Sequence, residues 1–181
     1  MRVIAGDYRR LILKAPKGDN TRPTQDRIKE TLFNMINDKL YDVRFLDLFS
    51  GSGGIGIEAL SRGARECFFI ENNKEAIKCI EDNIKTTKAE SKAHLIKSDA
   101  FSAIPSLAGT FDIVFMDPPY GHEYEKKALK LLKEHNRIDS DSLVIVEADL
   151  ETDFSYLEEY GYILIKEKKY KTNRHMFIRL R

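Results

Sequence analysis

Residues 47–56 read Asp47-Leu48-Phe49-Ser50-Gly51-Ser52-Gly53-Gly54-Ile55-Gly56. The largely apolar residues 43–46 come before this segment, and residues 57–60 after it have helical spacing. The pattern is that of a buried strand, a glycine loop and the first turn of a helix. Such a unit is typical of α/β sheets, which bind ligands at the carboxyl ends of their strands.

The glycine loop suits two kinds of cofactor. Gly51, Gly53 and Gly56 have the G-x-G-x-x-G spacing of dinucleotide-binding enzymes, and twenty residues after the first glycine Glu71 stands where a ribose-binding acid is expected. A nicotinamide oxidoreductase is therefore one interpretation. Asp47 opposes it, because a carboxylate at the strand end would repel pyrophosphate at the helix N-terminus. S-adenosylmethionine carries an ammonium group, a ribose diol and no phosphate, so both acids suit it.

A second motif, Asp117-Pro118-Pro119-Tyr120, directly follows the strand pattern of residues 111–116. Its prolines lack backbone donors and fix φ, so a rigid turn holds a carboxylate, a carbonyl and an aromatic ring together. The Asp117 carboxylate and the Pro118 carbonyl can each accept one N–H of an exocyclic amine while Tyr120 stacks on the base. Two such acceptors favour the pyramidal geometry in which the amine attacks. The structural alternative is a proline turn with a packed tyrosine.

Apolar strand patterns alternate with helical periodicity along the chain, which predicts an α/β domain with a parallel sheet covered by helices on both faces. The expected strands are residues 45–48, 66–70, 94–97, 112–116 and 143–147. We also expect a hairpin over residues 1–13, a helix carrying Ile28 to Ile36, and an antiparallel hairpin over residues 161–181. The 181 residues then form one domain, with residues 1–41 as an extension and residues 42–181 as the core.

Asp99 ends the third expected strand, at the same sheet edge as the other acids. It could accept from an adenine amino group, and it could equally cap the following helix. The histidines share no helical face or ligand spacing, so we expect neither a metal site nor an imidazole base; they are His94, His122, His135 and His175. Of these we expect only His122 near the site, as a surface loop residue.

Charge is distributed unevenly, although the net charge is only +1. Residues 1–44 and 166–181 are both basic, and the segment between them is acidic. Basic ends suit a polyanionic partner, and the alternative is an ordinary solvated surface. The sequence has no apolar run as long as a membrane span and no signal-peptide pattern at its start, so we expect a cytoplasmic protein without a membrane contact.

The motifs and their flanking text resemble the RsmD-type small-subunit ribosomal RNA guanine-N2 methyltransferases of bacteria, class I S-adenosylmethionine-dependent enzymes. The resemblance rests on the glycine loop, Glu71, Asp99 and the DPPY motif, and on several amino-terminal segments. These segments are Arg2-Val3-Ile4-Ala5-Gly6, Arg22-Pro23-Thr24 with Arg27, Glu30-Thr31-Leu32-Phe33-Asn34 and residues 45–53. The DPPY and glycine motifs are shared with adenine and cytosine amine methyltransferases, so the guanine assignment depends on the amino-terminal segments.

The resemblance implies a Rossmann-like, three-layer fold with a seven-stranded sheet whose last strand is reversed. It implies that S-adenosylmethionine is held by Asp47, Phe49, Ser50, Gly51, Ser52, Gly53, Glu71, Asn72, Asp99 and Ala100. The flipped base would be held by Asp117, Pro118, Pro119 and Tyr120. Ribosomal RNA would be contacted by Arg10, Arg22, Thr24, Arg27, Lys168, Lys169, Lys171 and Arg174.

The expected reaction is direct in-line methyl transfer to an unstacked guanine, without a covalent enzyme intermediate. We expect a monomer without a metal ion, acting on ribosomal RNA in an assembled or assembling small subunit. The alternatives are a DNA or RNA adenine-N6 methyltransferase, a protein methyltransferase, and a non-catalytic RNA-binding assembly factor.

Overall fold

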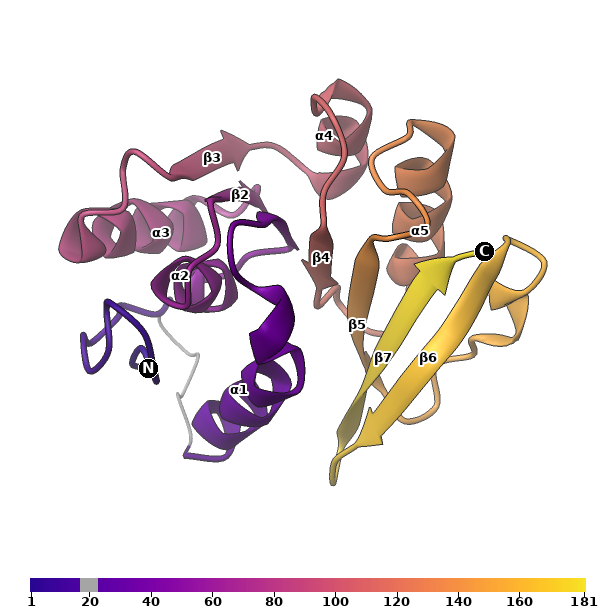
Figure 1. The fold of residues 1–181 in the computed structure, drawn as a ribbon, viewed down its shortest axis with the longest axis horizontal. Helices are drawn as coiled ribbons and strands as arrows, with labels where there is room; N and C mark the ends of the chain where they lie inside the picture. The colour runs from indigo at the N-terminus through magenta and orange to yellow at the C-terminus, as the bar shows by residue number, and fades with distance from the viewer. Residues whose placement is uncertain (17–22) are drawn as a thin grey trace.

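A seven-stranded sheet with the order β3-β2-β1-β4-β5-β7-β6 crosses the molecule (Figure 1). The computed structural model describes residues 1–16 and 23–181, except for the side chains of residues 23–25. The strands are β1 (Arg44–Leu48), β2 (Glu66–Glu71), β3 (Ala93–Lys97), β4 (Ile113–Met116), β5 (Leu143–Asp149), β6 (Tyr162–Lys169) and β7 (Asn173–Leu180). β1 to β5 are parallel, and β7 is antiparallel to both β5 and β6. The predicted fold, including the reversed last strand, is confirmed.

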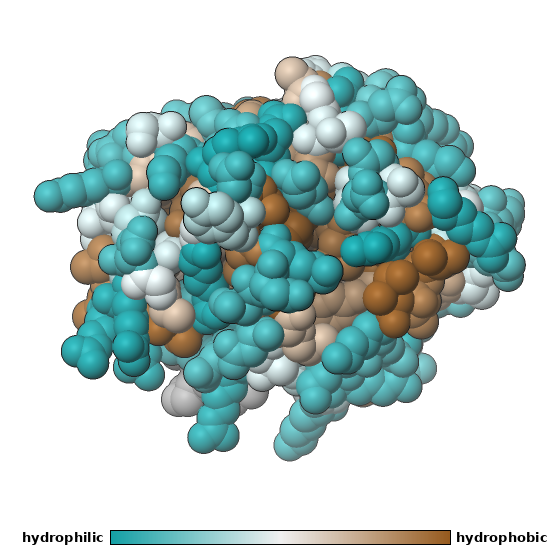
Figure 2. Space-filling view, in the orientation of Figure 1, coloured by the Kyte–Doolittle hydropathy of each residue, from teal (hydrophilic) through white to brown (hydrophobic). Residues whose placement is uncertain are grey.

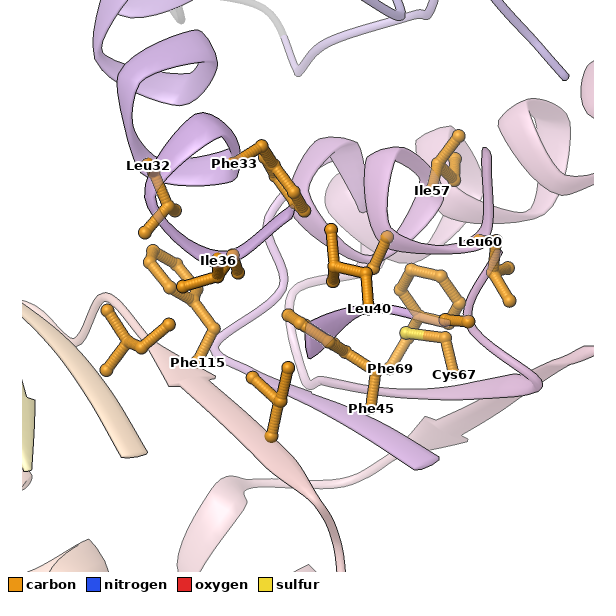
Figure 3. Close-up of a cluster of buried hydrophobic side chains, with 14 of the residues drawn as sticks. Leu32, Phe33, Ile36, Leu40, Phe45, Ile57, Leu60, Cys67, Phe69 and Phe115 are labelled. Carbon is orange, nitrogen blue, oxygen red and sulfur yellow. The ribbon is translucent and has the colours of Figure 1, made fainter. Parts of the chain in front are cut away.

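Helices cover both faces of this sheet. They are α1 (Pro23–Ile36), α2 (Gly54–Ser61), α3 (Lys74–Thr87), α4 (Ala100–Ser106) and α5 (Tyr124–Glu134), with 3-10 turns η1 (Asn37–Lys39) and η2 (Ser155–Leu157). Buried side chains from α1, α2 and α3 pack on one face, and those from α4 and α5 pack on the other. Figure 3 shows the first of these cores, in which α1 and α2 lie over β1, β2 and β4.

Residues of β1 alternate between the two cores. Phe45 packs in the core under α1 and α2, whereas Leu46 and Leu48 pack in the core under α4 and α5. Because side chains of a strand alternate between faces, Asp47 points to the same side as Phe45. The acid therefore lies beneath α1 and α2, at the end of a strand that is buried on both faces as parallel strands usually are.

Gly56 allows α2 to lie close to β2. A Cβ atom built at this glycine would be 2.3 Å from the Phe69 ring and 2.5 Å from the Cys67 sulfur. Both side chains are fully buried and have little room to move. The third glycine of the G-x-G-x-x-G spacing thus serves helix–strand packing.

Gly56→Ala should lower the free energy of unfolding by about 1–3 kcal/mol, because a methyl group would overpack this contact. Urea denaturation followed by circular dichroism measures the change. Gly54→Ala is a matched control in the same helix, since its added Cβ would meet the flexible end of Met1. An equal or smaller loss for Gly56→Ala than for the control would contradict the packing role.

The amino-terminal segment forms a short version of the predicted hairpin. Arg2 and Ile12 make an isolated antiparallel bridge, and beside it Val3 N donates to the Leu11 carbonyl at 3.0 Å and Leu13 N to the Met1 carbonyl at 2.9 Å. Between these two arms, Ile4 N and Ala5 N donate to the Glu58 carboxylate at 2.8 and 3.1 Å. The hairpin is thereby fastened to α2.

Glu58 is the centre of a buried ionic cluster. Its side chain has no exposed surface, and it lies 3.5 Å from Lys29 Nζ and 2.9 Å from Arg62 Nε. Lys29 Nζ also donates to the Arg2 carbonyl at 2.7 Å. The cluster joins the amino-terminal segment, α1 and α2, the helix that follows the glycine loop.

The surface seen in Figure 2 is mainly hydrophilic, and hydrophobic residues gather chiefly on the side of the carboxyl-terminal strands. β6 contributes exposed Ile163, Leu164 and Ile165. Within the described residues, no helix has the length and apolar character needed to span a membrane.

Candidate active site

The site lies where the strand order reverses. β2 and β3 follow β1 on one side, and β4 pairs with β1 on the other. Asp47 in β1 and Asp117 just after β4 therefore flank the switch point, the usual ligand position in such sheets. Three adjoining cavities of about 210, 270 and 430 Å³ open here, and all three have Phe49 in their walls.

The first cavity contains the buried carboxyl group of Asp47, which is 1% exposed. Its Oδ2 accepts a hydrogen bond of 3.0 Å from Gly56 N in the first turn of α2. A protein carboxylate thus occupies the position where a helix N-terminus would bind pyrophosphate. Burial, followed by the charges of Glu71 and Asp117, raises the pKa of Asp47 well above its usual range. A cationic ligand suits this cavity, and a dinucleotide does not.

The glycine loop is held in a sharp turn. Phe49 adopts a left-handed φ of 60°, and Gly53 one of 75° at the N-cap of α2. Ser50 Oγ donates to the Asp47 carbonyl at 2.6 Å, and Gly51 N donates to Glu71 Oε2 at 2.8 Å. Ser52 lines the first cavity with Ser50 and Gly51. Gly53 fixes the turn and is not in the wall.

The second cavity has acids at its edge and rings in its wall. It is lined by Phe49, Ile70, Glu71, Asn72, Ser98, Asp99, Ala100, Phe101, Pro119 and Tyr124. Phe101 meets Phe49 and Tyr124 edge to face, at centroid distances of 6.0 and 5.2 Å. Such a wall can hold a flat heterocycle. Within the described residues, Glu71 Oε2 accepts one hydrogen bond, from Gly51 N of the glycine loop. A carboxylate oxygen can accept two, so this atom can also accept from a ribose hydroxyl.

Asp99 combines both roles that its sequence position allows. Its Oδ1 accepts from Phe101 N and Ser102 N, each at 3.1 Å, which makes it the N-cap of α4. Hydrogen bonding with Ser102 lowers the pKa of Asp99. The same side chain lines the second cavity, where an ionised carboxylate can accept from an amino group.

The third cavity brings the whole DPPY motif together with Glu71, Asn72 and Phe49. Tyr120 is 45% exposed, so its ring is accessible for stacking. Burial of the hydroxyl group, followed by the charges of Asp117 and Glu147, raises the pKa of Tyr120. Asp117 also lines the first cavity, so it lies in the walls of both the first and the third cavity. This arrangement places the Asp117 carboxylate, which can accept from an amine, beside the cavity that contains Asp47.

Three titratable residues that line the first cavity were not predicted as site residues: Lys29, Glu147 and His175. The expectation that only His122 would lie near the site is wrong in this respect, because β7 pairs with β5 and sets His175 opposite Glu147. No local motif signals that pairing. The burial of Lys29 could have been predicted from the sequence, because this lysine lies on the apolar face of α1 at helical spacing from Leu32 and Phe33.

The residues predicted to contact RNA fall into two groups. Arg10 and Arg27 line a separate cleft of about 600 Å³ together with Arg2, Arg9, Asp26 and Glu30. Lys168, Lys169 and Lys171 lie on or beside the β6–β7 hairpin. Arg174 is mostly buried, and it donates to Glu167 at 2.8 Å and to the Thr152 carbonyl. Arg22 and the side chain of Thr24 lie outside the described residues.

Comparisons with known proteins agree with this geometry. A family model described as "Conserved hypothetical protein 95" matches residues 1–179. The chain is 36% identical over 171 residues to "Ribosomal RNA small subunit methyltransferase D" of Haemophilus influenzae, covering 93% of this chain and 88% of that one. The chain belongs to this family. The predicted membership of the RsmD-type methyltransferases is thereby confirmed.

Two further proteins are similar along nearly the whole chain. "Putative rRNA methyltransferase YlbH" of Bacillus subtilis is 38% identical over 172 residues, covering 93% of this chain and 92% of the relative. The solved structure "Putative methyltransferase yhhF from Escherichia coli" superposes with a TM-score of 0.86 at 30% identity, covering 99% of this chain and 97% of that one. The chain therefore has the fold of a methyltransferase.

Proposed function

We propose that the protein transfers a methyl group from S-adenosylmethionine to the exocyclic N2 amine of a guanine in small-subunit ribosomal RNA. The observation that carries this is the position of Asp117 between an acid-lined cavity and the cavity formed by its own DPPY motif. The names of the relatives, which include small-subunit ribosomal RNA methyltransferases, support the RNA substrate.

The cavity residues fit S-adenosylmethionine. Asp47 would pair with its ammonium group, Glu71 would accept from the ribose diol, and Asp99 would accept from the adenine amine. Phe49, Ser50, Gly51, Ser52, Asn72 and Ala100 would complete the walls around these groups, with Gly53 fixing the loop. When bound, the cofactor supplies a methyl group activated by a sulfonium.

The DPPY motif would hold the acceptor base. The Asp117 carboxylate and the Pro118 carbonyl would each accept a hydrogen bond from one N–H of the amine, which directs the nitrogen lone pair towards the methyl group. Tyr120 would stack on the base, and Pro119 would close the wall beside it. A paired base cannot enter this pocket, so the target must be flipped out of its helix.

Basic side chains outside the cavities would contact the phosphates of the RNA. The cleft that contains Arg10 and Arg27 is one candidate surface, and the lysines of the β6–β7 hairpin form another. We propose that the protein acts as a monomer on an assembled or assembling small subunit, in the cytoplasm where these particles form. A sulfonium methyl needs no metal activation, so we propose that no metal ion takes part.

The test incubates purified protein with isotopically labelled S-adenosylmethionine and undermodified small subunits, followed by digestion and mass spectrometry of the nucleosides. Labelled N2-methylguanosine is expected. Labelled N6-methyladenosine would keep the amine chemistry but overturn the substrate. Absence of label in RNA would overturn the proposed function, and would favour another acceptor or a non-catalytic RNA-binding role.

Cofactor binding should weaken as the pH falls through the raised pKa of Asp47. The protonated acid cannot pair with an ammonium group, so affinity is fully present above that pKa and is lost below it, at a pH higher than the roughly 3.9 of a free aspartate. Isothermal titration calorimetry over a series of pH values measures this, and Asp47→Asn is expected to flatten the profile. A profile identical in the wild type and Asp47→Asn would exclude Asp47 as the titrating group.

A further inference from the structure

Asp117 has a neighbouring carboxylate on the next strand. Met116 of β4 is in register with Val146 of β5, so Asp117 and Glu147 follow the two members of a register pair. Adjacent strands are about 4.8 Å apart. Both side chains line the first cavity, and Asp117 also lines the DPPY cavity. The Glu147 charge raises the pKa of Tyr120, so its carboxylate also lies near the ring that would stack on the base. Two carboxylates from neighbouring strands therefore lie where the first cavity meets the DPPY cavity.

Glu147 is held in a fixed orientation by β7. Its Oε2 accepts from His175 Nε2 at 2.9 Å, and its Oε1 accepts from Asn173 Nδ2. His175 is 1% exposed, and its Nδ1 lies 3.3 Å from the Tyr170 hydroxyl. If the tyrosine donates to Nδ1, the imidazole donates from Nε2, which matches the contact with the carboxylate.

The Glu147 carboxylate keeps capacity for a ligand. Among the described residues each of its oxygens accepts one hydrogen bond, and a carboxylate oxygen can accept two. The side chain is 18% exposed and reaches the cavity wall. His175 and Asn173 thus fix the orientation of the Glu147 carboxylate and leave it able to accept a further hydrogen bond.

Nucleobases differ in what stands next to their exocyclic amine. In guanine the N2 amine is beside N1–H, a donor. In adenine the N6 amine is beside N1, an acceptor, and in cytosine the N4 amine is beside N3, also an acceptor. A second carboxylate next to the amine-binding Asp117 attracts the donor of guanine and repels the lone pair of the other two bases.

We propose that Glu147 accepts the N1–H of the target base and so selects guanine, with His175 and Asn173 as positioning residues. This inference rests on the proposed function and names the specificity determinant of the same site. It gives the guanine preference a physical origin in β5 and β7, outside the DPPY motif.

The test compares guanine with 2-aminopurine at the acceptor position of a small subunit reconstituted with one synthetic RNA fragment. 2-Aminopurine keeps the 2-amine but has an unprotonated N1. The wild type should have a kcat/KM about 10- to 100-fold lower on 2-aminopurine, the cost of an unpaired buried acceptor. Glu147→Gln, whose amide can donate to N1, should lower kcat/KM on guanine and bring the two substrates within about threefold of each other.

2-Aminopurine also lacks the O6 of guanine, and this loss affects the wild type and Glu147→Gln alike. The difference between the two proteins in the ratio of kcat/KM on guanine to kcat/KM on 2-aminopurine therefore reports on Glu147. Glu134→Gln, an exposed change on α5, is the matched control and should keep the wild-type ratio. Thermal unfolding and cofactor affinity of Glu147→Gln report whether the variant is intact. Equal use of both bases by the wild type would overturn the inference whatever the variant does, and so would identical ratios in the wild type and Glu147→Gln. A wild type that methylates no guanine would overturn the proposed function itself.

Discussion

Asp117→Ala is expected to lower kcat by about 100- to 1000-fold, the usual cost of removing one preorganised polar group from a transition state. Asp117 lies in the walls of both the cavity that contains Asp47 and the cavity formed by the DPPY motif, so its carboxylate is the group best placed to orient the amine in the proposed reaction. The Pro118 carbonyl would remain as the second acceptor, which is why residual activity is expected. Single-turnover methylation of small subunits measures the effect on chemistry apart from product release.

Two controls separate chemistry from folding in this experiment. Asp141→Ala removes an exposed carboxylate far along the chain, before β5, and should leave kcat unchanged. Asp117→Asn keeps one acceptor oxygen and should lose less activity than the alanine variant. Near-normal turnover by Asp117→Ala would remove Asp117 from the mechanism.

Glu58→Ala should lower the free energy of unfolding by about 3–5 kcal/mol, because it leaves two buried cations without their shared carboxylate. Lys29 and Arg62 side chains are each only 6% exposed, and Ile4 N and Ala5 N would lose their acceptor as well. Burial already lowers the pKa of Lys29, an effect that the Glu58 charge opposes. A loss of this size is a large fraction of the roughly 5–15 kcal/mol that stabilises an ordinary domain.

Urea denaturation of the variant provides the measurement. Glu81→Ala is the comparison, because Glu81 also pairs with a lysine, Lys97, but at an exposed position. Exposed pairs contribute at most about 1 kcal/mol. If the two variants lose the same small amount, the buried cluster is not a major source of stability.

Much of the fold could be predicted because its signals are local. β1, the glycine loop and α2 are adjacent in sequence, and the strand before Asp117 is a continuous apolar run. Acids that follow parallel strands must reach the same sheet edge, so the meeting of Asp47, Glu71, Asp99 and Asp117 also followed from the strand assignment.

The remaining features depend on contacts between distant segments. His175 reaches the site only through the register of β7 against β5, which no short motif encodes. The amino-terminal hairpin was predicted, but its attachment to α2 was not, because Ile4 N and Ala5 N donate to Glu58, more than fifty residues away.

The hydrogen bond between Glu147 and His175 joins two residues that are synthesised at different times. A ribosome makes the chain from its amino end, and domains begin to fold during synthesis. Glu147 on β5 is made before His175 and Asn173 on β7, which emerge last and hold its carboxylate in place. In a growing chain the carboxylate therefore exists before the residues that orient it, and on our proposal selectivity for the base is the last property that the protein acquires.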